Sequence, residues 1–401
     1  MRSRLISSVL GAGALAVTAL TAGVQGAQAA APQPQLTHLS GVHAGRACTR
    51  TPAAGHASCF AKGLMNGKGR VPDAAAPLAT ALSPAQLRSA YNLGGGTTGG
   101  GRTVAIVDAY GYPNLERDLT IYRNYYGMPA CTTANDCLKI LDQNGGHNTP
   151  RTNLGWSQEQ ALDVDAVSAT CPTCKILVIQ TKTNSFANLG QGVITAAQQP
   201  GVVAISNSYG GGDLADSTYG SYYHHPGIAV TASTGDNGYQ GASYPASSAY
   251  VTAVGGTTLH MSGTTRSSET AWSGAGSGCS AYNAAVAPSS FNTGCGKRAI
   301  ADVSAAADPN YGGLSTYSPT SNKSSTWSQW GGTSESSPII AAVYALAGGG
   351  YSNTTPYQHA SSFWDITGGT NGSCPTIQWC QARSGWDGPT GLGTPNGTGA
   401  F

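Results

Sequence analysis

The sequence predicts an α/β fold in which a parallel sheet lies between two layers of helices. From Thr103 onward, short runs rich in β-branched residues alternate with longer stretches of helical pattern. This alternation is typical of parallel sheets with helices on both faces. Asp108 and Asp236 each follow a predicted strand closely. Because the chemistry of such folds lies at the carboxyl ends of the strands, both residues are expected near the functional edge of the sheet.

The elements follow in order along the chain. A first helix is expected after Ser83-Pro84, since Ser favours the N-cap and Pro the first helical position. A Gly/Thr-rich linker, residues 94–101, leads into the body. Strands are then predicted at 103–107, 175–179, 202–206 and 228–232, with another at 250–257, and helices at about 113–126, 157–169, 184–199 and 334–347.

The start of the chain has the pattern of a secretory signal peptide. A basic start, an apolar stretch from Leu5 to about Val24 and the cleavage pattern Ala27-Gln28-Ala29 predict a signal at residues 1–30. A membrane anchor is the alternative, but no stop-transfer flank follows. We expect a secreted, extracellular protein with a short propeptide or N-terminal extension at residues 31–80 and one main domain at 81–401.

The composition excludes some classes of partner. Only 9% of residues are charged and the formal net charge is +2, so no basic stripe predicts nucleic-acid binding. No second segment is apolar enough to span a membrane. Nothing in the sequence indicates an obligate partner, so a monomer is expected.

The ten cysteines form five close pairs in the sequence, and in an exported protein this pattern predicts local disulfides. The pairs are Cys48 with Cys59, Cys131 with Cys137, Cys171 with Cys174, Cys279 with Cys295, and Cys374 with Cys380. The Cys171-Pro172-Thr173-Cys174 segment could instead be a redox motif or half of a zinc site.

A candidate nucleophile, Ser334, stands at the start of a predicted buried helix. Gly331-Gly332-Thr333-Ser334 is followed by Pro338 and then by the apolar run 339–346. This pattern displays a nucleophilic serine at a helix N-terminus. The histidine that usually accompanies such a serine has no counterpart in a His-Gly-Thr-His context, and His147, downstream of Asp108, lies in a loop-like stretch. Another group must therefore accept the proton.

Glu159 and Asp163 are the candidates for that role. Their spacing of four residues places the carboxylates one above the other on one helix face. A solvated polar face would show the same spacing. In a functional pair, one carboxylate acts as a base while the other orients it and tunes its pKa.

Asp236 lies in the turn Gly235-Asp236-Asn237-Gly238. Aspartate is common in turns of this composition, and that is the alternative interpretation. A protonated aspartate could also donate a hydrogen bond to an oxyanion, and one such donor is worth roughly 3 to 4 kcal/mol in the transition state.

Taken together, these motifs resemble the sedolisins, the serine-carboxyl peptidases. Glu159, Asp163, Asp236 and Ser334 match the Glu, Asp, oxyanion Asp and Ser of that family, and the opening Leu82–Tyr91, Tyr244-Pro245-Ala246 and Val254-Gly255-Gly256-Thr257 match as well. The resemblance implies a subtilisin-like, three-layer α/β/α fold and an endopeptidase that cleaves proteins or peptides at acidic pH through an acyl-enzyme on Ser334. The chain departs from the family in one respect. Sedolisins usually carry a long, separately folded prodomain, whereas here only the short segment 31–80 lies between the predicted signal and the main domain.

The resemblance also implies one structural calcium ion in a C-terminal loop region. Its ligands would be the carboxylates of Asp365 and Asp387 and the backbone carbonyls of Ile366, Arg383 and Gly385. Ligation by oxygen atoms alone suits calcium. Without the resemblance, these aspartates would be interpreted as loop caps.

Two other functions are compatible with the same sequence. A catalytically silent, exported binding or cell-wall protein could use the same scaffold. A tripeptidyl-type exopeptidase would share every catalytic residue and differ only in how its cleft is closed.

Overall fold

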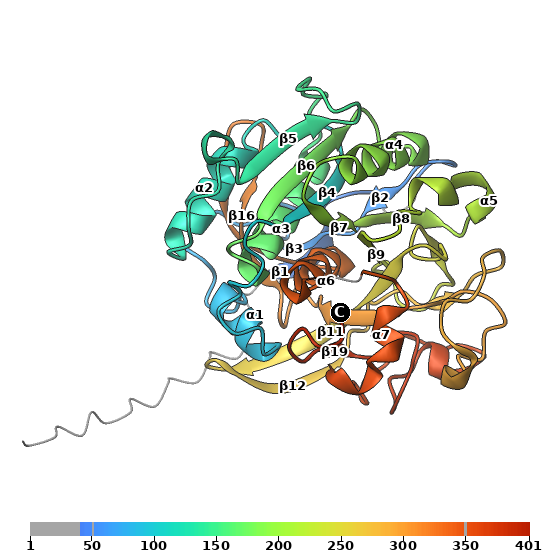
Figure 1. Ribbon diagram of the computed structural model, residues 1–401. Coiled ribbons are helices and arrows are strands. Elements are labelled where there is room, and N and C mark those ends of the chain that lie inside the picture. The colour runs from blue at the N-terminus through green and yellow to red at the C-terminus, as the bar shows by residue number, and fades with distance from the viewer. Residues whose placement is uncertain (1–40, 50–51, 349–350) are drawn as a thin grey trace, which may run out of the picture. The chain divides into compact units, whose positions relative to one another are not determined.

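An eight-stranded sheet forms the centre of the computed structural model, which describes residues 41–49, 52–348 and 351–401 (Figure 1). Its strand order is β12-β11-β9-β7-β4-β6-β5, and β15 pairs with β11 as well. The strands are β4 (Thr103–Ala109), β5 (Leu138–Asp142), β6 (Lys175–Thr181), β7 (Val202–Asn207), β9 (Ala229–Ser233), β11 (Thr252–Ser262), β12 (Thr265–Ala271) and β15 (Val303–Ala306). All neighbouring pairs are parallel except β11 with β12.

Helices cover both faces of this sheet. Successive residues of β4 point to opposite sides, so Val104 and Ile106 join one apolar core while Ala105 and Val107 join the other. The first core is shared with α1 (Pro84–Ala90), α2 (Leu115–Tyr125), α3 (Leu154–Thr170) and α6 (Thr333–Ala347), and the second with α4 (Phe186–Ala197). The predicted three-layer α/β/α architecture is confirmed.

The predicted elements agree closely with the observed ones. The strands expected at 103–107, 175–179 and 202–206 become β4, β6 and β7, and the helix expected at 334–347 becomes α6. At the start of α1 the Ser83 side chain accepts a hydrogen bond from Gln86 N while the Gln86 side chain accepts one from Ser83 N. This reciprocal capping explains why that helix begins where the sequence predicts.

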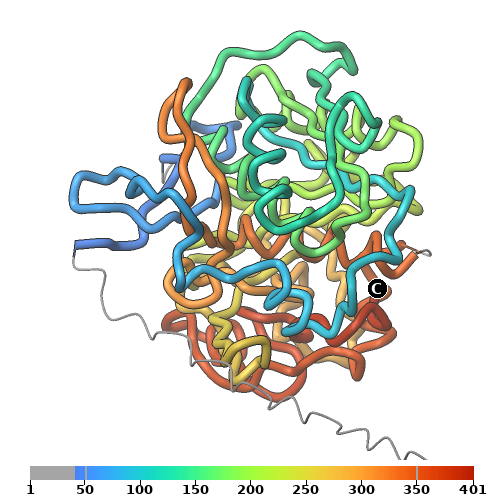
Figure 2. The backbone as a smooth tube through the Cα atoms, turned by 90° about the vertical axis from the view of Figure 1, so that its left-hand side faces the viewer, coloured from blue at the N-terminus to red at the C-terminus, as the bar shows by residue number. Residues whose placement is uncertain are grey.

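Two smaller sheets join the segment after residue 40 to the rest of the domain. One has the order β1 (Val42–Arg46), β3 (Lys62–Asn66), β17 (Ser325–Gly331) and β16 (Leu314–Pro319), and Figure 2 shows the blue N-terminal strands beside the orange hairpin of β16 and β17. The other has the order β10 (Ser243–Tyr244), β8 (Tyr209–Gly212) and β2 (Ser58–Cys59). The described part of the predicted propeptide or extension is thus packed into the same compact unit as the main domain.

The remaining elements are short. They are α5 (Asp216–Tyr219), α7 (Thr355–Gln358), the paired strands β13 (Gly278–Cys279) and β14 (Ala299–Ile300), the paired strands β18 (Phe363–Trp364) and β19 (Thr394–Pro395), and 3-10 turns at Thr133–Asn135, Gly220–Tyr222, Ser289–Phe291, Ala360–Ser362 and Ile377–Trp379. All five predicted cysteine pairs form disulfides. The predicted signal peptide lies outside the described residues. Within the described part of the chain, no helix has the length and apolar character needed to cross a membrane.

Candidate active site

Ser334 lies in the first turn of α6. The residue before the helix, Gly332, has a φ of +93°, a left-handed conformation that glycine adopts without strain. Ser334 is buried, and its hydroxyl donates a 3.2 Å hydrogen bond to the carbonyl oxygen of Ser208. Because Pro338 has no N–H, the Ser334 carbonyl lacks its helical donor, and it lies 3.3 Å from the Ser208 hydroxyl instead. Ser208 therefore holds the first turn of α6 at two points.

Glu159 and Asp163 project from α3, a helix buried on every side from Trp156 to Thr170. Both carboxyl groups are fully buried, so the alternative of a solvated helix face is excluded. Asp163 Oδ1 accepts a 2.9 Å hydrogen bond from the hydroxyl of Ser208, the residue that also contacts Ser334. The structure thus brings α3 and α6 together around Ser208.

The carboxyl group of Glu159 lies beside the Ser334 hydroxyl. Burial raises the pKa of Glu159 well above its usual range, and the charge of Asp108 raises it further. The neighbouring Ser334 hydroxyl and the backbone N–H of Ala61, which donates a 2.7 Å hydrogen bond to Glu159 Oε2, lower this pKa in part, while Oε1 accepts no hydrogen bond from the described residues. A base within hydrogen-bond reach of a serine hydroxyl is the arrangement that nucleophilic catalysis requires.

Asp108 also belongs to the carboxyl cluster of Glu159 and Asp163, although its sequence context did not predict this. It lies near the end of β4, fully buried, and neither of its oxygens has a hydrogen-bond partner in the described residues. Burial raises the pKa of Asp108. Burial also raises the pKa of Asp163, and the charges of Asp108 and Glu159 raise it further. Three buried carboxyl groups that raise one another's pKa do not all ionise together, so their titrations are coupled. The signal for Asp108 in the sequence was its position at the carboxyl end of a strand.

Asp236 stands on the other side of the α6 N-terminus. Its Oδ1 accepts hydrogen bonds of 2.8 Å from both the backbone N–H and the hydroxyl of Thr333, the residue before Ser334. Its Oδ2 is buried and has no hydrogen-bond partner in the part of the chain that the structure describes. Burial raises the pKa of Asp236, although the cations Lys62 and Arg46 offset part of this effect. A neutral carboxyl group with an unused oxygen can donate a hydrogen bond.

A stretch of the chain itself, residues 57–62, runs through this site. Strand β2 pairs with β8 in antiparallel register, with Ser58 opposite Gly210. The backbone N–H of Phe60 donates a 3.3 Å hydrogen bond to Ser208 O, the same oxygen that accepts from Ser334. Lys62 Nζ donates a 2.6 Å hydrogen bond to the carbonyl oxygen of Asp236. This stretch therefore contacts the elements that carry all four predicted catalytic residues.

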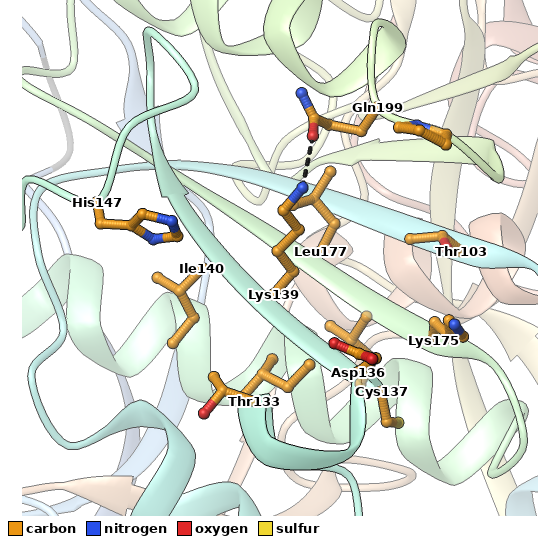
Figure 3. A pocket seen from close by; sticks show the side chains of 13 residues that line it. Thr103, Thr133, Asp136, Cys137, Lys139, Ile140, His147, Lys175, Leu177 and Gln199 are labelled. Atoms are coloured by element: carbon orange, nitrogen blue, oxygen red, sulfur yellow. Dashed lines mark hydrogen bonds between the residues drawn. The ribbon is translucent and has the colours of Figure 1, made fainter.

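His147 takes no part in this site. It lines a cavity of about 650 Å³, where its ring lies near Ile140 and where Lys139 donates a hydrogen bond to Gln199 (Figure 3). Thr103, at the start of β4, lines the same cavity, whereas Asp108 lies near the end of that strand. The cavity is thus at the opposite edge of the sheet from Ser334, and a triad through His147 is excluded.

The predicted calcium loop brings Asp365 and Asp387 close together. The backbone N–H of Gly385 donates to Asp365 Oδ2, and that of Arg383 donates to Asp387 Oδ2, both at 3.0 Å. Burial raises the pKa of Asp387 to about 7, and the charge of Asp365 contributes to the rise. No described residue donates a backbone hydrogen bond to the carbonyl oxygens of Ile366, Arg383 or Gly385. Paired carboxylates and unused carbonyls fit the oxygen ligands that calcium prefers, although no described cluster combines three or more His, Cys, Asp or Glu side chains in a metal-binding arrangement.

Comparison with known proteins identifies the class to which this fold and site belong. A model of the subtilase family matches residues 144–366, more than half of the chain, so the chain belongs to the subtilase family. Kumamolisin from Bacillus sp. (strain MN-32) is 30% identical over an alignment of 358 positions that covers 79% of this chain and 62% of kumamolisin. The chain thus spans less than two thirds of that relative's length.

Two solved structures have a similar fold. Pseudomonas sedolisin, a serine-carboxyl proteinase solved with two molecules of pseudo-iodotyrostatin, superposes with a TM-score of 0.65 at 23% identity, over 79% of this chain and 96% of that one. A psychrophilic protease superposes with a TM-score of 0.50 at 15% identity, over 80% of this chain and 98% of that one. At these identities the likeness shows the fold alone. With the kumamolisin match, the predicted membership of the sedolisin branch of the subtilisin-like serine peptidases is confirmed.

Proposed function

We propose that this chain is a serine-carboxyl endopeptidase that hydrolyses peptide bonds of proteins and peptides at acidic pH. The observation that carries this proposal is the buried contact between the Ser334 hydroxyl and the Glu159 carboxyl group, in a cluster with Asp163 and Asp108. Carboxyl groups on a solvated surface or in ion pairs would not be buried beside a serine in this way. A protein that only binds a ligand would not need such a cluster. Perturbed carboxyl groups around a serine at a helix N-terminus support nucleophilic catalysis.

In the proposed mechanism, Ser334 attacks the carbonyl carbon of the substrate while Glu159 takes the hydroxyl proton. Glu159 then returns this proton to the leaving amine, and water hydrolyses the acyl-enzyme by the same path in reverse. Asp163, held by Ser208 at 2.9 Å, orients Glu159 and shares its proton. Glu159, oriented by Asp163, thus takes the role that an imidazole plays in other serine peptidases.

Asp236 supplies the oxyanion donor in this proposal. Its raised pKa favours the neutral form, and its Oδ2 is free to carry the proton. The N-terminus of α6 adds backbone N–H groups and the positive end of the helix dipole. Such donors stabilise the charge that develops on the substrate oxygen in the transition state.

The cleft supports an endopeptidase rather than a tripeptidyl exopeptidase. Residues before Phe60 continue along the cleft, since Ala57 N donates a 2.8 Å hydrogen bond to Asn184 O and His56 forms a bridge with Ser185. In a tripeptidyl exopeptidase, a cleft closed after three substrate residues would block this path. The path from Phe60 back to His56 is therefore longer than a tripeptide.

One structural calcium ion belongs to the proposal as well. Asp365 and Asp387 would hold it through their carboxylates, and Ile366, Arg383 and Gly385 through their carbonyls. The ion would neutralise two carboxylates that otherwise repel each other and would tie β18 to the loop before β19. It takes no part in the chemical steps.

The protein is proposed to be exported by a signal at residues 1–30 and to act as a monomer. Five disulfides suit an oxidising compartment. Residues 31–80 are proposed to be a propeptide or extension of the peptidase domain at 81–401.

A pH profile tests the proposed activity. Hydrolysis of a denatured protein by the full chain should follow a bell-shaped curve with its maximum below pH 6, and an aldehyde inhibitor directed at serine peptidases should label Ser334. A maximum near pH 8 would contradict the neutral Asp236. A chain that neither hydrolyses the substrate nor takes the label at any pH would be a silent binding protein instead.

A further inference from the structure

We propose that the Phe60–Ala61 peptide bond is the bond at which this protein cleaves itself, so that its first substrate is its own N-terminal segment. The inference rests on the proposed peptidase function. It comes from the placement of residues 56–62, which lie in the catalytic cleft as an extended polypeptide with that one bond at the reacting groups.

The segment before the bond lies between two edges of the cleft. On one side Ser58 and Cys59 pair with Gly210 and Tyr209 of β8 in antiparallel register. On the other side Ala57 exchanges hydrogen bonds with Asn184, through Ala57 N to Asn184 O at 2.8 Å and Asn184 Nδ2 to Ala57 O at 2.6 Å. Hydrogen bonds to the backbone of the segment on both edges fix an extended strand without regard to its sequence. The segment is therefore held as a peptide substrate would be.

Phe60 fills a pocket with glycine walls. Phe60 is 7% exposed, and its ring packs against Gly210 and Gly235, where an added Cβ would lie 2.8 Å and 3.6 Å from the ring's Cζ. The pocket also contains Asp236 and Thr234, and about 250 Å³ of it remains open beside the ring. A buried aromatic side chain fixes the register of a bound strand, so the bond after Phe60, and no other, is brought to the site.

Each end of the Phe60–Ala61 peptide group meets a catalytic group. The N–H of Ala61 donates a 2.7 Å hydrogen bond to Glu159 Oε2. The carbonyl oxygen of Phe60 lies against Gly332, where an added Cβ would be 2.2 Å from that oxygen and 2.5 Å from Asp236 Oδ2. The oxygen that becomes the oxyanion and the unpartnered carboxyl oxygen thus lie on the same side of Gly332. The Phe60 N–H and the Ser334 hydroxyl share one acceptor, Ser208 O, so the nucleophile lies next to this backbone.

The chemical step balances with the groups already in place. Ser334 Oγ forms a bond to the carbonyl carbon of Phe60 while its proton passes to Glu159. The bond between that carbon and Ala61 N breaks, and Glu159 returns the proton to the nitrogen, which becomes a new amino terminus. Water then attacks the Phe60 ester, gives one proton to Glu159, and leaves a Phe60 carboxyl group, while Ser334 recovers its hydroxyl proton from Glu159.

The disulfide pattern allows the cleaved segment to leave. Cys48 is bonded to Cys59, and both lie on the amino-terminal side of the Phe60–Ala61 bond. The released piece therefore has no covalent link to the peptidase domain. Strand β3, which begins at Lys62, pairs with β17, so only the segment before Ala61 is released, and the subsites from Ala57 to Phe60 become free for other substrates.

The test is to follow the full chain by intact mass and N-terminal sequencing after transfer from pH 8 to pH 4. We expect a new amino terminus at Ala61, formed at a first-order rate independent of protein concentration, and hydrolysis of an added peptide that rises as the intact chain disappears. The Ser334→Ala chain should stay intact. Ala61→Pro removes the N–H that Glu159 accepts, and Phe60→Asp removes the anchor, and each should slow cleavage at least about tenfold. The matched control Phe291→Ala alters a half-buried phenylalanine that packs on Tyr357 and should leave the rate unchanged.

The outcomes separate this inference from the proposed function. A chain that hydrolyses the added peptide while its terminus stays before residue 41, or lies at any bond other than Phe60–Ala61, overturns the inference and leaves the peptidase function standing. A chain that cleaves neither itself nor the peptide overturns both.

Discussion

Glu159 Oε2 accepts a 2.7 Å hydrogen bond from the backbone N–H of Ala61. The Ser334 hydroxyl lies beside this carboxyl group and lowers its pKa. One carboxyl group thus contacts both the nucleophile that must lose a proton and a nitrogen that must gain one.

Removing the nucleophile or the base should abolish turnover. Ser334→Ala and Glu159→Gln should each lower kcat by at least about 1,000-fold, because the two groups act as a unit. The measurement is hydrolysis of a denatured protein at pH 4, with circular dichroism to show that each variant is folded. Residual turnover above a hundredth of the wild-type rate in Ser334→Ala would contradict the assignment.

Asp236→Asn should extend activity to higher pH. The raised pKa of Asp236 keeps the carboxyl group neutral in acid, and activity is lost as pH rises through that pKa, because the ionised group repels the oxyanion. An amide donates at every pH in this range. The alkaline limb of kcat/KM should therefore move upward in the variant, even if its maximum is lower. If the alkaline limb of kcat/KM does not move in the variant, the ionisation that causes this limb belongs to a group other than Asp236.

The buried acids predict that the fold loses stability as pH rises. The pKa values of Asp108, Glu159 and Asp163 are raised by burial. Their contribution to folding is complete below the ordinary carboxyl pKa and is lost as pH rises through the higher folded values. In a Ser334→Ala background, the free energy of unfolding in urea should fall by more than about 1 kcal/mol between pH 4 and pH 7.

Asp108→Asn isolates the part of this effect that one acid contributes. The amide cannot ionise, so the decline in unfolding free energy between pH 4 and pH 7 should be smaller in the variant than in its Ser334→Ala parent. An equal decline would show that Asp108 ionises without cost in the fold.

The glycine walls of the Phe60 pocket predict the substrate preference. Gly210→Ala adds a methyl group 2.8 Å from the position of the Phe60 ring's Cζ, so kcat/KM for peptides cleaved after Phe should fall roughly tenfold relative to peptides cleaved after Ala. The control is Gly212→Ala, which lies on the same strand with no atom within 4 Å of the added group. Equal changes in the two variants would contradict this pocket as the specificity site.

Calcium should stabilise the C-terminal loop. Millimolar calcium should raise the Tm of the full chain by several degrees, and a chelator should reverse this, by ligand linkage. Asp365→Asn and Asp387→Asn should each reduce the calcium-dependent shift in Tm. A full shift in both variants would place the ion elsewhere.

Local sequence patterns predicted most of the helices and strands of the central domain. The Ser83-Pro84 start of α1, the alternation around β4 and the apolar run of α6 each depend on neighbouring residues, so they can be recognised along the chain. The boundaries of α3 and α4 differ from the prediction by only a few residues, because helix ends are set by capping contacts such as Asn153 with Trp156 N.

The sequence by itself determined that Ser334 starts a buried helix, that Glu159 and Asp163 share a helix face, and that the cysteines pair locally, since each of these depends on spacing along one segment. Only the tertiary structure decided that α3 and α6 meet around Ser208, that Asp108 joins the carboxyl cluster, and that residues 57–62 lie in the catalytic cleft. These relationships join segments far apart in the chain. They depend on strand pairing and on burial, which remove water from the acids and shift their pKa values, and no local pattern records them.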